Sequence, residues 1–389
     1  MLSFNDTEIA FAYRSKHELK KAKLLFAILS WPILVKIGQI LVIFAIKSKL
    51  PIAWLIKPTI FKQFIGGETL VESLPVVRNL QKYNVNSILD YSVEGQENEE
   101  SQRNAYDEIL RSIENARGKS AITHVVFKPT GLIKVCILEK VSNGTPLSNE
   151  EHQHYKMFIE RIDNLCQAAS EVDKPLLMDA EDSWYQKALD DICHEMMKKY
   201  NSKKALVYNT LQMYRKDRLK FLKNSHILAI ENGYMLGIKF VRGAYMEKER
   251  ERALILGYPS PIQNSKVDTD NDFNTALEYA INNINTISIF CGTHNEESVK
   301  LLVSLMAKSG INPNDPRITF SQLYGMSDNI SFNLANAGFN VAKYIPYGPV
   351  KFVMPYLFRR AQENTSVKGQ TNRELMLIKQ ELKRRKRQI

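Results

Sequence analysis

Eight short apolar runs alternate with longer helix-like stretches along most of this chain, and this alternation restricts the possible folds more than any other feature. The runs lie at 87–91, 124–128, 175–179, 205–212, 237–243, 287–292, 317–323 and 340–346. The stretches between them are long enough for crossover helices, for example 101–117, 149–171, 184–200 and 296–308. Strands that alternate with helices form parallel sheets, and eight such units close naturally into a barrel. The sequence therefore predicts an α/β protein with a (βα)8 TIM-type barrel preceded by N-terminal helices.

The competing fold is an open, doubly wound sheet. Sheets of that kind that bind dinucleotides carry a glycine-rich GxGxxG loop after a strand, and none of the eight runs is followed by one. The barrel interpretation divides the chain into an N-terminal helical region at 1–85, a catalytic barrel domain at 86–368, and a C-terminal helix with a basic tail at 369–389.

The composition is that of a folded protein with reduced thiols. Of 389 residues, 44% are hydrophobic and 24% are charged, which disfavours disorder away from the ends. The four cysteines are widely spaced, so neither a disulfide framework nor a CxxC metal site is predicted. No HExxH spacing indicates a metal and no GxSxG motif indicates a serine hydrolase. We expect no metal and a cytoplasmic location.

The net charge of +11 is concentrated in two lysine- and arginine-rich segments, at 16–23 and 383–387. Such an excess could serve nucleic acid, a membrane surface or an acidic ligand. No motif typical of nucleic-acid binding lies between the two segments, so we do not expect a nucleic-acid partner.

The segment 24–46 is strongly apolar, but Pro32 interrupts it and it contains Lys36 and Gln39. A second apolar patch follows at 51–60, whereas a spanning helix needs roughly 20 mostly uncharged residues. Three interpretations stay open: helices packed on the main domain, an interfacial membrane-binding helix pair, and a true span. The flanking lysines suit the second, because they can meet anionic head groups. The first residues lack the basic start of a signal peptide, so secretion is not expected.

Polar or ionisable residues lie at the end of every predicted strand, where barrel enzymes carry their active-site loops. They are Asp90, Lys128, Asp179, Gln212, Arg242, Thr293-His294-Asn295, Gln322 and Tyr344. An Asp at this point is as often only the cap of the next helix. A lysine that emerges from a barrel strand is rarely there for packing, so Lys128 is a firmer functional candidate than Asp90 or Asp179.

The segment Val241-Arg242-Gly243-Ala244-Tyr245 follows the fifth run with small residues, which let backbone amides approach a ligand closely. A tight turn explains the glycine equally well, but Lys239 and Arg242 favour an anion site. The segment Thr293-His294-Asn295 could be a helix N-terminus with His294 as a satisfied histidine at the rim, or it could bind a phosphate or adenosine group.

Two adjacent arginines, Arg359 and Arg360, stand between Tyr356 and Glu363, a combination that suits a small zwitterion such as an amino acid. An ion pair on a solvated helix face explains the same spacing. Position favours the receptor, since Pro346 and Pro349 fix a loop after the eighth run and the helix that carries the arginines begins directly beyond it.

These residues resemble the proline dehydrogenase family, flavin-dependent (βα)8 enzymes that also form one domain of bifunctional proline-utilisation proteins. The matching segments are 89–95, 178–181, 239–245, 293–295, 323–326 and 344–364. The resemblance covers about residues 61–368, and it is specific because the motifs recur in order at the same strand ends.

The resemblance implies L-proline as substrate and FAD as cofactor. Arg359 and Arg360 would grip the proline carboxylate with Lys128 and Glu363 in ion pairs nearby, while Leu323, Tyr344 and Tyr356 would wall the ring. The implied catalytic group is Lys128, Asp179, Tyr344, Arg359, Arg360 and Glu363. The implied flavin site is Asp179, Gln212, Lys239, Val241, Arg242, Gly243, Ala244, Tyr245, Lys266, Thr293, His294, Asn295 and Glu363.

The implied reaction moves a hydride from C5 of proline to flavin N5 and yields Δ1-pyrroline-5-carboxylate, the first step of proline catabolism. The family typically passes the electrons to a membrane quinone, and a separate pyrroline-5-carboxylate dehydrogenase would oxidise the product. The apolar N-terminal region and the basic tail are then candidates for peripheral membrane contact, at the inner face of the cytoplasmic membrane.

Three positions depart from patterns within the family. Lys239 stands where many bacterial members have Arg, and Tyr324 where some have His. Hydroxyproline-acting relatives have a small residue at the position of Tyr344, where a tyrosine would crowd a ring hydroxyl, so proline is favoured. Hydroxyproline oxidation and a non-catalytic, anion-binding barrel stay open as alternatives.

Overall fold

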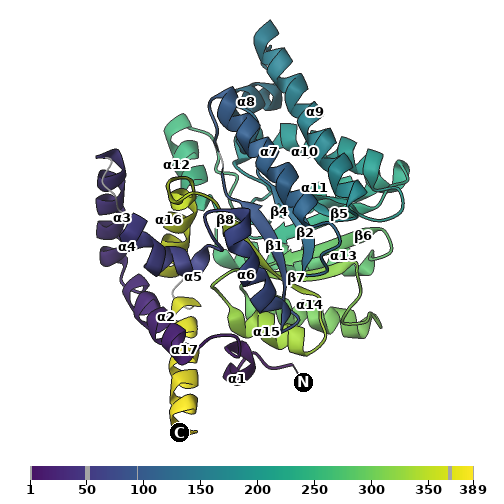
Figure 1. The fold of residues 1–389 in the computed structure, drawn as a ribbon. Coiled ribbons are helices and arrows are strands. Elements are labelled where there is room, and N and C mark those ends of the chain that lie inside the picture. Colours follow the sequence, from purple (N-terminus) through teal and green to yellow (C-terminus); the bar gives the residue numbers. More distant parts are fainter. Residues whose placement is uncertain (1, 49–52, 94, 367–369, 389) are drawn as a thin grey trace. The chain divides into compact units, whose positions relative to one another are not determined.

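The computed structural model describes residues 2–48, 53–93, 95–366 and 370–388. Its strands form a closed barrel whose neighbours follow chain order, and β8 returns to β1 (Figure 1). The strands are β1 (Asn86–Tyr91), β2 (Ile122–Phe127), β3 (Leu176–Met178), β4 (Val207–Gln212), β5 (Leu236–Val241), β6 (Ile287–Gly292), β7 (Ile318–Leu323) and β8 (Val341–Tyr347). Each overlaps one predicted run, which confirms the (βα)8 barrel with preceding helices.

The helical elements before β1 are α1 (Thr7–Ala10), α2 (Lys16–Leu29), α3 (Pro32–Lys47), α4 (Ala53–Ile56), the π-helical turn η1 (Lys57–Phe61), α5 (Lys62–Phe64) and α6 (Leu70–Gln81). Those between β1 and β8 are α7 (Glu99–Asn115), the 3-10 turn η2 (Pro129–Gly131), α8 (Val135–Asn143), α9 (Asn149–Glu171), α10 (Ser183–Tyr200), α11 (Arg218–Glu231), α12 (Met246–Leu256), α13 (Lys266–Asn282), α14 (Glu296–Lys308) and α15 (Asp328–Asn336). After β8 come α16 (Val350–Ser366) and α17 (Gln370–Arg387), and the basic run 383–387 forms the last turns of α17.

Contacts divide the chain into two compact units, which we call unit 1 and unit 2. Unit 1 is Met1–Ser92 with Gln322–Ile389, and unit 2 is Val93–Ser321. The division into parts at 85 and 368 that the sequence suggests stays a prediction.

In unit 2, parallel strands are paired in a regular register around an apolar core. Val125 lies opposite Leu176, Tyr208 opposite Gly237, and Ile289 opposite Ile318. Because the strands run in parallel, their carboxyl ends meet at one rim, and the polar residues that end them gather there.

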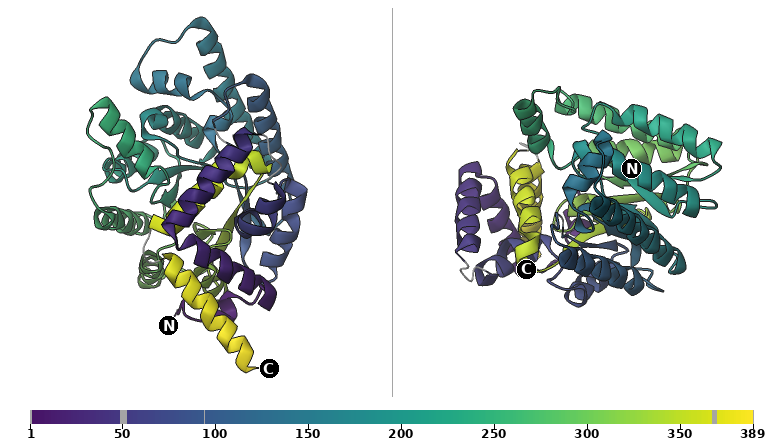
Figure 2. Two further views of the ribbon diagram at one scale, coloured as in Figure 1. Left: turned by 90° about the vertical axis from the view of Figure 1, so that its left-hand side faces the viewer. Right: turned by 90° about the horizontal axis from the view of Figure 1, so that it is seen from above.

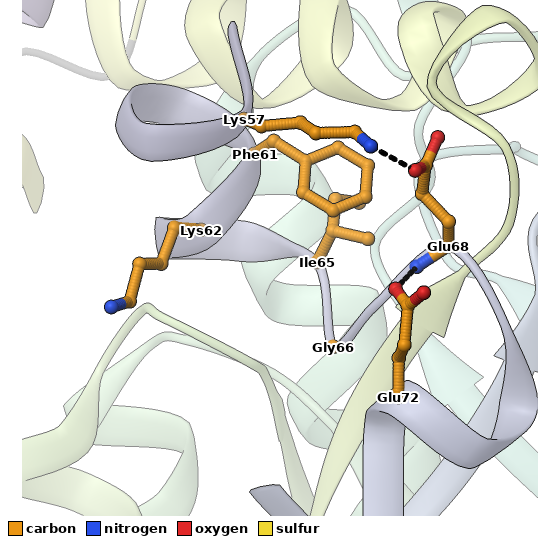
Figure 3. Close-up of a pocket in the computed structure, with 7 residues that line it drawn as sticks. All are labelled: Lys57, Phe61, Lys62, Ile65, Gly66, Glu68 and Glu72. Atoms are coloured by element: carbon orange, nitrogen blue, oxygen red, sulfur yellow. Dashed lines mark hydrogen bonds and ion pairs between the residues drawn. The ribbon is translucent and has the colours of Figure 1, made fainter. Parts of the chain in front are cut away.

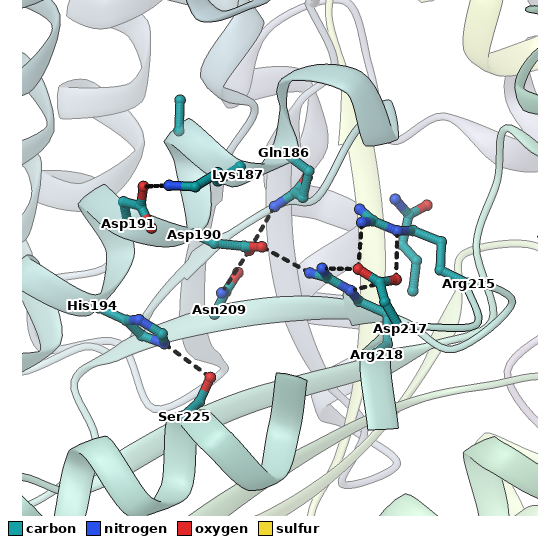
Figure 4. A network of polar contacts seen from close by, with 12 residues as sticks. Gln186, Lys187, Asp190, Asp191, His194, Asn209, Arg215, Asp217, Arg218 and Ser225 are labelled. Carbon is teal, nitrogen blue, oxygen red and sulfur yellow. Dashed lines mark hydrogen bonds and ion pairs between the residues drawn. The ribbon is translucent and has the colours of Figure 1, made fainter. Parts of the chain in front are cut away.

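A buried polar network joins α10 and α11 to β4 (Figure 4). The carboxylate of Asp190 accepts hydrogen bonds from Gln186 and Asn209 at 3.0 Å each, and from Arg218 at 2.7 Å. A buried carboxylate is stable when several donors replace its water. The network thereby fixes β4, the strand that ends at Gln212.

The helices of unit 1 share a second hydrophobic core. Side chains of α2, α3, α16 and α17 form one buried cluster that includes Phe26, Leu357 and Leu377. Figure 2 shows α3 beside α16, and the two helices contact each other. Segments that lie more than 300 residues apart in the chain therefore stabilise one another.

Asp328, the first residue of α15, is the centre of a buried charge cluster in unit 1. It accepts a hydrogen bond from the Tyr13 hydroxyl at 2.7 Å, and it pairs with Arg14 at 3.2 Å and Lys343 at 2.9 Å. The Lys343 side chain is 0% exposed. Burial is the main cause that raises the pKa of Glu374, which also belongs to unit 1, to about 7, and the negative charge of Asp328 adds to this rise.

Replacing Asp328 tests this cluster. We expect Asp328→Ala to lower the free energy of unfolding by about 3–5 kcal/mol, because it leaves the Lys343 ammonium buried without its counter-charge. Chemical denaturation measures the change. Asp191→Ala is the matched control, since its pair with Lys187 is exposed, and we expect it to change the same free energy by less than about 1 kcal/mol. If both variants change the free energy of unfolding by less than about 1 kcal/mol, the buried cluster does not stabilise the fold as we expect.

Candidate functional site

Asp179 directly follows β3 and joins the ends of three strands in unit 2. Its Oδ1 accepts a hydrogen bond from Lys239 Nζ at 2.5 Å, and its Oδ2 accepts one from Lys128 Nζ at 3.1 Å. Lys128 directly follows β2 and is 7% exposed, while Lys239 lies in β5 and is 6% exposed. The structure thus brings together three residues that the sequence indicated separately, with one carboxylate between two buried ammonium groups.

His124 in β2 adds no positive charge to this region. Its ring centroid lies 5.0 Å from that of Phe290 in an edge contact and 6.0 Å from that of Tyr208. Burial is the main cause that lowers the pKa of His124 to about 3, and the positive charges of Lys174 and Lys239 lower it further. The ring is therefore neutral at physiological pH.

Gln212 and the segment 243–245 form the rim at the ends of β4 and β5. The Gln212 Nε2 donates to the Glu181 carbonyl at 2.6 Å, and its Oε1 accepts from the Ala244 N–H at 3.4 Å. Gly243 has φ +125°, and a Cβ there would lie 2.4 Å from the Tyr214 ring. Only glycine fits this close passage, so the turn requires it whatever else the segment does. Val241 ends β5 and Tyr245 directly precedes α12.

Arg242 is braced by protein groups. Its guanidinium donates to Asp270 at 2.7 Å, to the Thr293 hydroxyl at 2.6 Å and to the Ser298 hydroxyl at 2.9 Å. Asp270 also accepts a hydrogen bond from Lys266. Burial alone would raise the pKa of Asp270, but the hydrogen bonds from Lys266 and Arg242 bring it below its usual value. Arg242 therefore ties β5 to α13 and α14, and what it contributes to a ligand stays a prediction.

The segment Thr293-His294-Asn295 leads into α14, and its proposed role in binding a phosphate or adenosine group stays a prediction. The Asn295 Oδ1 accepts from the N–H groups of Glu297 at 2.9 Å and Ser298 at 3.1 Å, which caps α14. The Thr293 hydroxyl accepts from the Asn295 N–H at 3.2 Å, and His294 between them is half-buried. A helix N-terminus next to a threonine is a setting that favours anions.

In unit 1, α16 carries Tyr356, Arg359 and Arg360. Arg360 is 5% exposed, and its guanidinium carbon lies 5.0 Å from the centroid of the Tyr356 ring. Arg359 is half-buried. Arg360 is consequently not part of a solvated helix face. The side chain of Glu363 lies outside the residues whose side chains the structure describes.

Two further residues predicted to wall the substrate lie on strands in unit 1, one at a strand end and one in the middle of its strand. Leu323 is the last residue of β7, and Tyr344 is a buried residue of β8. The Tyr344 carbonyl accepts a hydrogen bond from the Tyr324 N–H at 2.9 Å. Because successive strand residues face opposite sides, Tyr344 faces away from the side on which Lys343 meets Asp328.

Sequence reasoning missed two residues that support these groups. Asp270 links Arg242 with Lys266, and Glu181 is buried and accepts from the Thr130 N–H at 3.3 Å and the Tyr185 hydroxyl at 3.2 Å. Asp270 stands four residues after Lys266, the spacing of a helical ion pair, and that signal could have revealed it. For Glu181 the contact with Thr130 offered no comparable signal, because these two residues lie 51 positions apart in the chain.

A small pocket of about 200 Å³ lies in unit 1 and contains none of the predicted site residues (Figure 3). It is lined by Lys57, Phe61, Lys62, Ile65, Gly66, Glu68 and Glu72. Lys57 is paired with Glu68, and the Glu68 N–H donates to the Glu72 carboxylate at 2.8 Å. Lys57 and Glu68 thus neutralise each other, and we do not assign the pocket a ligand.

Over the described residues, no group of three or more His, Cys, Asp or Glu side chains is arranged to hold a metal ion. Nor does any one helix in those ranges combine the length and the apolar character needed to cross a bilayer. Lys16–Leu29 and Pro32–Ala45 meet both criteria only as a pair, and that pair is bent by 95°.

The fold and these strand-end groups define a (βα)8 barrel with an enzyme-like polar rim, and comparison with known proteins gives its family. The sequence model described as proline dehydrogenase matches residues 73–373. The chain belongs to the proline dehydrogenase family.

Individual relatives are consistent with this assignment. Proline dehydrogenase 1, mitochondrial, of Dictyostelium discoideum is 34% identical over 379 residues, which cover 86% of this chain and 66% of that protein. The hydroxyproline dehydrogenase of Xenopus laevis is 30% identical over 421 residues, covering 99% of this chain and 90% of that protein. The chain thus spans just under two thirds of the Dictyostelium relative.

A solved structure supports the fold. Proline utilization A from Bdellovibrio bacteriovorus superposes with a TM-score of 0.70 over 79% of this chain and 33% of that one. At 21% identity, this likeness supports the barrel architecture and nothing finer.

The shared carboxylate of Asp179 can be tested by its removal. We expect Asp179→Ala to lower the free energy of unfolding by about 3 kcal/mol or more, because two buried ammonium groups then lose a counter-charge that they share. Adding Lys128→Met should recover part of that loss, since one of the two charges is gone. Thermal and chemical denaturation of the two variants provide the measurement. If the single variant costs less than about 1 kcal/mol, or if Lys128→Met deepens the loss, the proposed balance of charges is wrong.

Proposed function

We propose that this chain oxidises L-proline to Δ1-pyrroline-5-carboxylate with bound FAD. The observation that carries the proposal is the buried Arg360 guanidinium stacked on Tyr356 beside a second arginine, in a barrel of the proline dehydrogenase family. A guanidinium binds a carboxylate bidentately and an aromatic ring packs against an apolar substrate ring, so this arrangement suits a small amino acid such as proline.

The residues of the unit 2 rim fit a flavin. Gly243 and Ala244 carry no large side chains, so the backbone of 243–245 can come close to a bound group. Lys239 supplies a buried positive charge, and the start of α14 favours a diphosphate. The residues that would hold FAD are Asp179, Gln212, Lys239, Val241, Arg242, Gly243, Ala244, Tyr245, Lys266, Thr293, His294, Asn295 and Glu363.

The residues proposed for the substrate bind and orient it. Arg359 and Arg360 would clamp the carboxylate, while Leu323, Tyr344 and Tyr356 would hold the ring, with Lys128 and Glu363 in supporting ion pairs. Bound FAD supplies the chemistry, by accepting a hydride from C5 of the proline ring. The amine must be neutral before hydride leaves, and no side chain at this rim is assigned as its base. The rate should therefore rise with pH as the free amine fraction grows.

The Xenopus relative makes hydroxyproline the second candidate substrate. Tyr344 argues against it, because the side chain is buried and its ring leaves less room for a hydroxyl on the substrate ring. A barrel that only binds an anion is the non-catalytic alternative, and the absence of any flavin reduction would favour it.

The remaining parts of the proposal concern partners. Electrons would pass from reduced FAD to a membrane quinone, which requires a peripheral membrane contact, and a separate pyrroline-5-carboxylate dehydrogenase would consume the product. We place the protein in the cytoplasm, against the inner face of the membrane. We also propose the functional division into a helical region at 1–85, a catalytic barrel at 86–368 and a C-terminal segment at 369–389.

Replacing Arg360 tests the clamp. We expect Arg360→Lys to raise the KM for proline by tenfold or more while FAD content stays at the wild-type level, because an ammonium cannot bind a carboxylate bidentately. Dye-coupled proline oxidation gives KM, and the absorbance ratio gives FAD content. Arg384→Lys on α17 is the matched control and should leave both unchanged. An unchanged KM in Arg360→Lys would place the carboxylate elsewhere.

Replacing Tyr344 tests the choice of substrate. We expect Tyr344→Ser to raise kcat/KM for hydroxyproline relative to proline, because the smaller side chain makes room for the ring hydroxyl. If the wild type already prefers hydroxyproline, the assignment of proline is wrong.

For proline itself, kcat/KM of the wild type should rise by about tenfold per pH unit while the amine is mostly protonated.

A further inference from the structure

The outer sides of α2, α3 and α4 hold the largest group of exposed apolar side chains. Among the described residues, 23 large apolar side chains are exposed, and 12 of them lie between 24 and 55. They are Leu24, Ile28, Trp31, Ile33, Leu34, Ile37, Ile40, Leu41, Ile43, Phe44, Trp54 and Leu55. We call this set the outer apolar surface. Contiguous apolar area of this kind is rare on proteins that are surrounded only by water.

The part of the outer apolar surface that lies on α3 forms a regular helical face. Ile33, Ile37, Ile40 and Phe44 follow the i, i+4, i+7, i+11 spacing of a single helical stripe. The opposite side of the helix is already used, since Val35 is buried and α3 contacts α16. The exposed stripe is therefore apolar surface beyond what the core of unit 1 requires.

The segment that carries this surface contains charges of one sign only, and just one of its described lysines, Lys57, is paired with an acid beyond it. Residues 19–67 contain eight lysines and no Asp or Glu. Six of these lysines are described and exposed, namely Lys20, Lys21, Lys23, Lys36, Lys57 and Lys62. A second copy of the same face would bring like charges together, whereas an anionic surface would be attracted.

The same segment has the side chains of a membrane interface. Two of the three tryptophans, Trp31 and Trp54, belong to the outer apolar surface and are exposed. Tryptophan prefers the depth of lipid head groups, and lysines beside an apolar helix face meet anionic lipids. The 95° bend between α2 and α3 suits helices that lie in the plane of the interface better than helices that cross it.

We propose that the outer apolar surface inserts into the head-group region of an anionic lipid bilayer, with α3 lying in the plane of the membrane. This proposal names the surface that makes the membrane contact of the proposed function. Its biological role rests on that function. Binding itself requires neither proline nor an electron acceptor. A chain that binds vesicles without oxidising proline, or the reverse, would separate the two proposals.

Co-sedimentation of the full chain with vesicles tests the proposal. We expect binding to phosphatidylglycerol-containing vesicles and little binding to pure phosphatidylcholine. On the anionic vesicles, tryptophan emission should shift to the blue, and the shift should be lost in Trp31→Phe/Trp54→Phe. Ile33→Glu/Ile40→Glu should weaken binding by tenfold or more, because it places two carboxylates in the lipid-facing stripe. Lys20→Gln/Lys21→Gln/Lys23→Gln should weaken binding by about fivefold for each lysine, and more at low salt.

The matched control is Ile227→Glu/Ile230→Glu on α11, where both isoleucines are exposed but belong to unit 2. It should bind vesicles as the wild type does, and circular dichroism should show all variants folded. Equal binding to neutral vesicles, unchanged binding in Ile33→Glu/Ile40→Glu, or equal loss in the control would overturn the proposal. So would resistance to alkaline carbonate extraction, which indicates a span, or a dimer that Ile33→Glu/Ile40→Glu dissolves and that does not bind vesicles.

Discussion

The carboxylate of Asp179, held between the Lys128 and Lys239 ammonium groups, is the interaction on which the candidate site depends. It joins the ends of β2, β3 and β5, and it allows two positive charges to exist where water is largely excluded. His124 stays neutral nearby because burial lowers its pKa. The result is a rim that carries buried positive charge beside a carboxylate, a setting that a flavin with its diphosphate can use.

In unit 1, buried contacts between distant segments likewise hold a helix that carries proposed site residues. The arginines proposed to clamp the substrate lie on α16, and α16 shares a core with α2, α3 and α17. The charge cluster of Asp328, Lys343 and Arg14 joins α15 and β8 to the N-terminal segment. Residues near the N-terminus thus stabilise the elements around the arginine pair, while the outer side of α3 is left apolar and available to a membrane.

Local pattern was sufficient to predict the strands but not the contacts between distant segments. Each strand overlaps a predicted apolar run, and the polar residues that follow them, such as Lys128 and Asp179, could be read directly from the sequence. Asp328 with Lys343, or Glu181 with Thr130, could not be predicted, because their partners are set by packing between remote parts of the chain. The contacts of Arg242 with Asp270, Thr293 and Ser298 could likewise not be predicted, and its role toward an anion stays a prediction.

If this barrel uses bound flavin to oxidise proline, as we propose, then proline must reduce that flavin. Anaerobic addition of L-proline to the purified full chain, followed by visible absorbance, tests it most directly. We expect a yellow protein whose flavin bands bleach with proline and hardly change with an equal concentration of hydroxyproline. A protein that cannot be loaded with FAD, or a flavin spectrum that proline leaves unchanged, would contradict it.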